Sequence, residues 1–183
     1  LIEAYTSSKA NPFTDALCLS GLEAASESII QAYDNGNDVT AREKMAYASL
    51  LSGICLANAG LGAVHGIAPA LGITFGISHG ESCALMLDKV MEHNRRFAVE
   101  KYARIGEILT KKKYCSDEEA GKAAVKFVTD LKKHMAVPTD LKHLGITEEE
   151  IPLLLKRTSS NSMKANTVLL SAAEVEKLIR SAM

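Results

Sequence analysis

The chain has 183 residues and a mass of 19.6 kDa, and 47% of its residues are hydrophobic, which fits one globular domain with its own core. Its 21 basic and 22 acidic residues leave a formal net charge of −1, so no global field attracts nucleic acid or an anionic membrane. No apolar run approaches the roughly 18 residues of a membrane span, and the N-terminus lacks a signal-peptide pattern. We therefore expect a cytoplasmic protein that binds neither nucleic acid nor membrane.

Helical apolar spacing begins after Asn11-Pro12, a pair that is typical of a helix start. The apolar face of this first helix comprises Leu19, Leu22, Ile29 and Tyr33. A loop at Asp34-Asn35-Gly36-Asn37 follows, and Thr40 with Glu43 then predicts a capping box. The apolar positions of this second helix are Tyr47, Leu50, Leu51 and Ile54.

Two more amphipathic helices are predicted in the second half of the chain. The earlier one has its apolar positions at Ala120, Ala124, Phe127, Val128, Leu131 and Met135 and stops before Pro138. The last one is short and is marked by Val175, Leu178, Ile179 and Ala182. No alternating run predicts a strand, so we expect residues 1–183 to form a single all-α domain, a helical bundle of about seven to nine helices.

The most informative stretch holds His65 and His79, two imidazoles fourteen residues apart in apolar surroundings. On one straight helix they would lie roughly 21 Å apart, whereas ligands of one metal ion, each bonded at ~2.1 Å, must nearly meet. A shared metal therefore requires the chain to reverse between Pro69 and Gly76, with His79 near the start of the next helix. The spacing alone is also compatible with an alternative to the metal site, in which each histidine is a separate polar residue in a helical core.

The four cysteines are far apart, and no Cys-x-x-Cys pair indicates a zinc ribbon or a redox motif. Cys18, Cys55 and Cys83 fall within apolar helical runs, which predicts buried thiols that stay reduced.

Several motifs in a fixed order carry a family resemblance. They are Ile2–Ser7, Ala10–Leu17, Ala41–Gly53, Ala57–Gly66, His79-Gly80 and Val90–Asn94. In this order they resemble the C-terminal half of the iron-containing (group III) alcohol dehydrogenases, over nearly the whole chain. The resemblance implies the helical C-terminal domain of the dehydroquinate synthase-like fold. It also implies that this chain is a fragment whose nucleotide-binding domain would lie before Leu1.

The family holds its metal through one Asp and three His, and the resemblance assigns His65 and His79 to the last two. The other two ligands match positions just before Leu1. The implied metal is Fe(II), or Zn(II), and the implied cosubstrate is NAD or NADP, with a small alcohol or aldehyde as substrate. No side-chain nucleophile is required. Glu81, two residues after His79, is a candidate hydrogen-bond partner for that imidazole or simply complements the helix dipole.

One departure from the family pattern concerns Pro69, where members usually carry another His near the substrate. Together with the missing ligands it leaves a second reading open, a helical interaction domain without catalysis. A third is a relative with the same layout, such as a zinc-dependent glycerol dehydrogenase or a maleylacetate reductase. We expect no nicotinamide-dependent activity from this chain alone. The sequence is compatible with assembly into a homo-oligomer.

Overall fold

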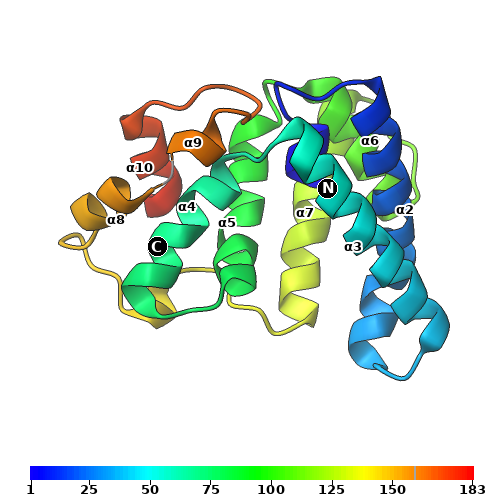
Figure 1. Ribbon diagram of the computed structural model, residues 1–183, viewed down its shortest axis with the longest axis horizontal. Coiled ribbons are helices and arrows are strands. Elements are labelled where there is room, and N and C mark those ends of the chain that lie inside the picture. Colours follow the sequence, from blue (N-terminus) through cyan, green and yellow to red (C-terminus); the bar gives the residue numbers. More distant parts are fainter. Residues whose placement is uncertain (159) are drawn as a thin grey trace.

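The computed structural model describes residues 1–158 and 160–183, and helices account for all the regular structure in these ranges (Figure 1). The α-helices are α1 (Ile2–Tyr5), α2 (Pro12–Asp34), α3 (Val39–Ala59), α4 (Ala63–Phe75), α5 (His79–Asn94), α6 (Val99–Thr110), α7 (Asp117–His134), α8 (Ile151–Arg157), α9 (Ser160–Met163) and α10 (Ala172–Arg180). A 3₁₀ helix, η1, spans Lys142–Leu144.

The all-α prediction is confirmed for the described residues, and the helices outnumber the expected seven to nine. The extra elements include α1 and α9, which have four residues each. A single turn is too short to show the helical period of apolar residues, so a sequence pattern does not detect it.

Local capping signals determine where the long helices begin. Asn11 caps α2 as expected, because its side chain accepts hydrogen bonds from the backbone N–H groups of Phe13 and Thr14. The predicted capping box of Thr40 and Glu43 is wrong. The helix starts earlier, at Val39, and the Asp38 carboxylate accepts the Ala41 N–H at 3.0 Å.

The buried face of α3 also differs from the expected one. Leu51 is buried, but Leu50 is 62% exposed and Tyr47 is 46% exposed. The residues that α3 buries beside Leu51 are small, namely Ala41, Ala48, Cys55 and Ala59. Small side chains let α3 lie close against α2, so the large apolar residues on its other sides face outward.

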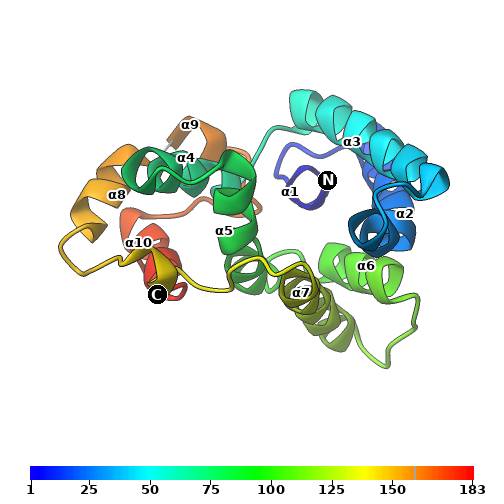
Figure 2. The same ribbon diagram turned by 90° about the horizontal axis from the view of Figure 1, so that it is seen from below.

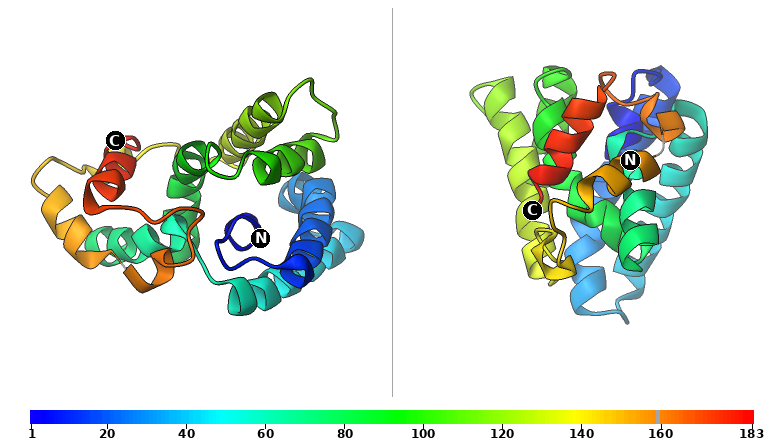
Figure 3. Two further views of the ribbon diagram at one scale, coloured as in Figure 1. Left: turned by 90° about the horizontal axis from the view of Figure 1, so that it is seen from above. Right: turned by 90° about the vertical axis from the view of Figure 1, so that its left-hand side faces the viewer.

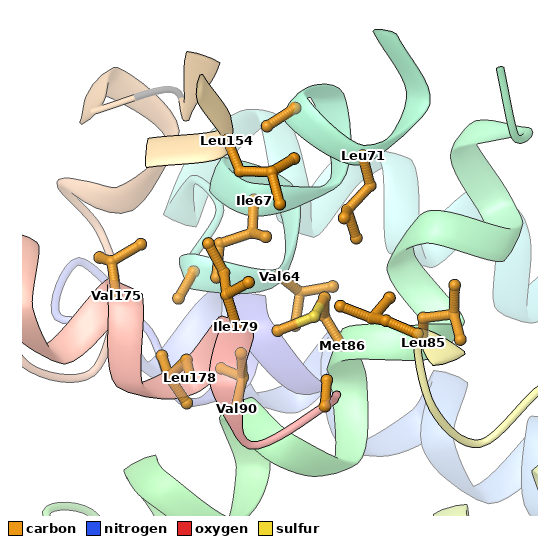
Figure 4. Close-up of a cluster of buried hydrophobic side chains, with 14 residues drawn as sticks. Val64, Ile67, Leu71, Leu85, Met86, Val90, Leu154, Val175, Leu178 and Ile179 are labelled. Carbon is orange, nitrogen blue, oxygen red and sulfur yellow. The ribbon is translucent and has the colours of Figure 1, made fainter. Parts of the chain in front are cut away.

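Two hydrophobic clusters form the core, and α5 contributes to both. The first cluster joins α4, α5, α8 and α10; its largest members include Ile67, Leu71, Leu85, Met86, Leu154 and Ile179 (Figure 4). The second joins α1, α2, α3, α5, α6 and α7; its members include Tyr5, Cys18, Leu22, Cys55, Met91 and Tyr102. Each large side chain buried in this way contributes roughly 1.5–3 kcal/mol through burial.

The first helix lies inside the molecule rather than on its surface. Figures 2 and 3 show α1 enclosed by α2, α3, α5 and the α6–α7 pair. A buried ion pair joins α7 to α5, because Lys132 Nζ lies 2.9 Å from Asp88 Oδ1. The Glu3 side chain of α1 hydrogen-bonds to Val64 and His65, near the start of α4.

No single helix of the described ranges is both long and apolar enough to cross a membrane. Taken together, α3 and α4 have the length and composition of a membrane span, but the two helices are bent by 105° against each other.

Candidate metal centre

The start of α4 is held by side chains from distant parts of the chain. Its N-cap residue is Gly62, which has no side chain to satisfy the first N–H groups of the helix. Asn166 Oδ1 accepts the N–H of Ala63 at 3.1 Å, and Glu3 Oε1 accepts the N–H of Val64 at 2.7 Å. The first turn of α4, which carries His65, is therefore fixed in position.

The backbone reverses between α4 and α5, as the histidine spacing required, at the C-terminal end of the expected range. Pro69 lies inside α4, which continues to Phe75 because Ile67 and Leu71 on the same helix are fully buried. Proline removes one hydrogen bond here without ending the helix. The turn falls at Gly76, whose φ of 70° is in the left-handed region, and Ser78 caps α5.

His79 is the first residue of α5, so the turn places it opposite the first turns of α4. The ring centroids of His65 and His79 lie 5.4 Å apart, with 53° between the ring planes. The predicted approach of the two imidazoles is confirmed by this distance. Their assignment as metal ligands stays a prediction.

Cys83 is the third side chain of the cluster. It lies one helical turn after His79 on α5, and its Sγ atom is 3.5 Å from His79 Nε2. One ligand atom from each of His65, His79 and Cys83 lies within 4.8 Å of the other two. Cys83 is half-buried rather than buried, so the expectation of a core thiol is wrong for this residue, although it holds for Cys18 and Cys55.

Glu3 orients His65. Its Oε2 atom lies 2.5 Å from His65 Nδ1, and its side chain is only 9% exposed. In the neutral imidazole, donation of Nδ1–H to this carboxylate leaves the Nε2 lone pair free for a metal. Hydrogen bonds to Cys83 and Glu3 raise the pKa of the His65 imidazole to about 9, while burial acts in the opposite direction.

Glu81, the partner expected for His79, lies elsewhere. Its Oε1 atom is 3.8 Å from His143 Nε2, and in the described residues it makes no hydrogen bond to His79. The carboxylate of the site comes from α1 instead. Sequence spacing gave no sign of it, because Glu3 and His65 are 62 positions apart.

The remaining histidines lie outside the cluster. His134 bonds to Asp34 at 2.8 Å on the surface, as expected of a helix-end residue. His93 is in the last turn of α5, fourteen residues from His79 and hence roughly 21 Å along the helix. Its buried Nε2 atom has no hydrogen-bond partner in the described part of the chain.

A cleft of about 450 Å³ opens beside the cluster. Its polar lining comes from Glu3, Ser52, His65 and Cys83. Most other lining residues are apolar and come from α1 to α5 and the loop between α3 and α4, with Leu22, Leu56, Leu61 and Leu87 among them. A mostly apolar cleft with a few converging polar groups is the usual form of a small-molecule site.

The comparisons with known proteins cover the full length of the chain. The model of the Fe-containing alcohol dehydrogenase family, C-terminal, matches residues 1–183. The chain therefore belongs to the Fe-containing alcohol dehydrogenase family and corresponds to its C-terminal region.

Among curated relatives, alcohol dehydrogenase 4 of Saccharomyces cerevisiae is 34% identical over 182 residues, which are 99% of this chain and 47% of the yeast protein. The 1,3-propanediol dehydrogenase of Klebsiella pneumoniae is 36% identical over 154 residues, 84% of this chain and 40% of that protein. The chain thus spans less than half the length of these relatives.

Solved structures show the same fold over the whole chain. A 1,3-propanediol oxidoreductase superposes with a TM-score of 0.95 at 32% identity, covering 100% of this chain and 48% of the other. The alcohol dehydrogenase from Oenococcus oeni gives a TM-score of 0.94 at 28% identity, with the same coverage.

Proposed function

We propose that this chain is the metal-binding helical domain of a metal-dependent alcohol dehydrogenase. In the longer enzyme, hydride passes between a small alcohol or aldehyde and NAD or NADP. The relatives support this reading, because their names include 1,3-propanediol dehydrogenase, NADPH-dependent butanol dehydrogenase and NAD-dependent methanol dehydrogenase.

The cluster of His65, His79 and Cys83 carries the proposal. Two imidazoles that converge from different helices, one of them oriented by a buried carboxylate, are typical of a transition-metal site. Imidazole suits both Fe(II) and Zn(II), so both metals are candidates for the native ion.

Each of these side chains has a defined task in the proposed site. A divalent ion held by His65 and His79 would supply Lewis-acid polarisation of the alcohol or aldehyde oxygen, and a bound nicotinamide would accept or donate the hydride. Glu3 holds the tautomer of His65 that leaves Nε2 free. The apolar walls of the cleft, including Leu56 and Leu87, receive the carbon chain of a small alcohol and exclude water.

Pro69 bears on substrate choice. It lies one turn after His65 on α4 and has no polar side-chain atom. The side chain at position 69 therefore offers no hydrogen bond to a substrate oxygen.

The test is calorimetric titration of the 183-residue chain with zinc chloride and, under anaerobic conditions, with ferrous sulfate. We expect binding that is lost in His65→Ala and His79→Ala. His134→Ala is the matched control, since it removes a surface imidazole that bonds Asp34, and it should bind like the parent chain. Elemental analysis then counts the bound metal.

Two outcomes contradict the proposal. Metal binding that is unchanged in both His65→Ala and His79→Ala rejects the ligand assignment. No binding by the parent chain, with circular dichroism showing a folded helical protein, rejects the proposal that His65 and His79 bind a metal in this chain.

A further inference from the structure

We propose that the Cys83 thiolate is a third metal ligand supplied by this chain, together with His65 and His79, and that it biases the centre toward zinc. This inference rests on the proposed function, because it assumes that the two imidazoles bind a metal. It concerns the ligands of this chain alone, whatever further ligands a longer protein supplies.

The helix geometry places the thiol at the right position. His79 and Cys83 are four residues apart on α5, so their side chains lie on the same face in successive turns. His65 reaches the same point from the first turns of α4. Three donors from two packed helices therefore converge on one volume.

The measured separation fits a shared metal ion. In a tetrahedral zinc site with Zn–N near 2.1 Å and Zn–S near 2.3 Å, nitrogen and sulfur ligands lie about 3.6 Å apart. Cys83 Sγ and His79 Nε2 lie 3.5 Å apart. One ligand atom from each of the three side chains lies within 4.8 Å of the other two, and His79 is exposed, so solvent reaches this side of the cluster.

The other thiols of the chain show that this position is unusual. Cys18 and Cys55 have no exposed surface and sit in the second core cluster. Cys115 is exposed, between α6 and α7. Cys83 is the half-buried one, and it lines the cleft beside His65, where a metal ion can reach it.

A thiolate changes which metal the site prefers. Sulfur is a soft ligand that favours zinc over the harder divalent ions, and its negative charge offsets one of the two positive charges of the ion. The S–H bond breaks on coordination, the sulfur keeps the electron pair and donates it to the metal, and the proton passes to solvent.

X-ray absorption at the zinc edge tests the assignment on the zinc-loaded 183-residue chain. We expect one sulfur scatterer at ~2.3 Å beside nitrogen or oxygen at ~2.0–2.2 Å. Cys83→Ser should remove the sulfur and weaken zinc binding by at least the roughly 10–100-fold that loss of an outer-shell partner costs. Cys115→Ser is the matched control and should keep both the sulfur signal and the affinity.

The outcomes separate this inference from the proposed function. A zinc shell of nitrogen and oxygen alone, or a sulfur signal that persists in Cys83→Ser, overturns the Cys83 assignment. If His65→Ala and His79→Ala still abolish binding, the proposed function survives that result. Failure of the parent chain to bind zinc overturns both. Serine is close to cysteine in size, and circular dichroism verifies that Cys83→Ser keeps its helices.

Discussion

Helices α3 and α4 follow one another in the chain and are both rich in apolar residues, yet α3 leaves more of its large side chains exposed. In α4 the large residues Ile67 and Leu71 are fully buried. In α3 the large Leu50 is 62% exposed, and small residues such as Ala48 are buried instead. Apolar content alone therefore does not determine which face of a helix packs.

The two helices also differ in how their first turns are stabilised. Asp38, next to α3 in sequence, caps that helix itself. Glu3 and Asn166, which are 61 and 103 positions from their partners, cap α4. The position of α3 thus depends on local sequence, whereas the metal-site end of α4 depends on the completed fold.

The largest expected effect concerns the buried face of α4. We expect Ile67→Ala to lower the free energy of unfolding by about 2–5 kcal/mol, because it removes a fully buried side chain from the first core cluster. Leu50→Ala on α3 should change it by no more than about 0.5 kcal/mol. Urea denaturation followed by circular dichroism measures both, and equal losses would mean that α3 packs through Leu50.

The second largest effect on stability is expected at Gly62, in the loop that connects α3 to α4. A Cβ atom there would lie 2.6 Å from Glu3 Oε1 and 2.7 Å from Asn166 Oδ1. Gly62→Ala must push both side chains away from the start of α4, leaving buried N–H groups without acceptors, so we expect a loss of about 1–3 kcal/mol.

Gly53, inside α3, provides the matched comparison. A Cβ atom there meets nothing within 4 Å, so Gly53→Ala should stabilise the protein by roughly 0.5–1 kcal/mol through helix propensity. Thermal unfolding of the two variants should thus shift in opposite directions. A Gly62→Ala variant as stable as the parent would show that Glu3 and Asn166 do not hold α4.

The third prediction concerns the carboxylate of Glu3. In Glu3→Gln, the amide oxygen can still accept the Val64 N–H, but the amide NH₂ then faces His65 Nδ1. His65 would shift its proton to Nε2 and lose the free lone pair, so we expect zinc affinity to fall roughly 10–100-fold. Calorimetric titration measures this, and an unchanged urea midpoint would separate ligand orientation from folding.

The sequence predicted those parts of the site that depend on local signals. The spacing of His65 and His79, with glycines between them, required a reversal, and the rings do meet. Cys83 had a local signal as well, since it is four residues after His79, but a cysteine in an apolar run is more typical of a core thiol. Glu3 had none, because its contact with His65 forms only when α1 is enclosed by other helices.

The sequence predicted the wrong buried face for α3, and the reason is again a contact that forms only in the complete fold. Large apolar residues at helical spacing mark the buried side only when the neighbouring helix leaves room for them. Here α2 packs against α3, and the residues that α3 buries include ones as small as Ala48 and Ala59. Which neighbour approaches, and how closely, is a tertiary property that the pattern of one helix does not contain.

The smallest effect expected is at the start of α3, where the predicted cap was wrong. Asp38→Ala removes the acceptor of the Ala41 N–H and should cost about 1 kcal/mol, the usual value for an N-cap. Thr40→Ala should stay within about 0.5 kcal/mol, because Thr40 is exposed and already inside the helix. Because Asp38 acts only on its own helix, zinc affinity should be unchanged in both variants. A larger loss from Thr40→Ala than from Asp38→Ala would restore the capping box that the sequence indicated.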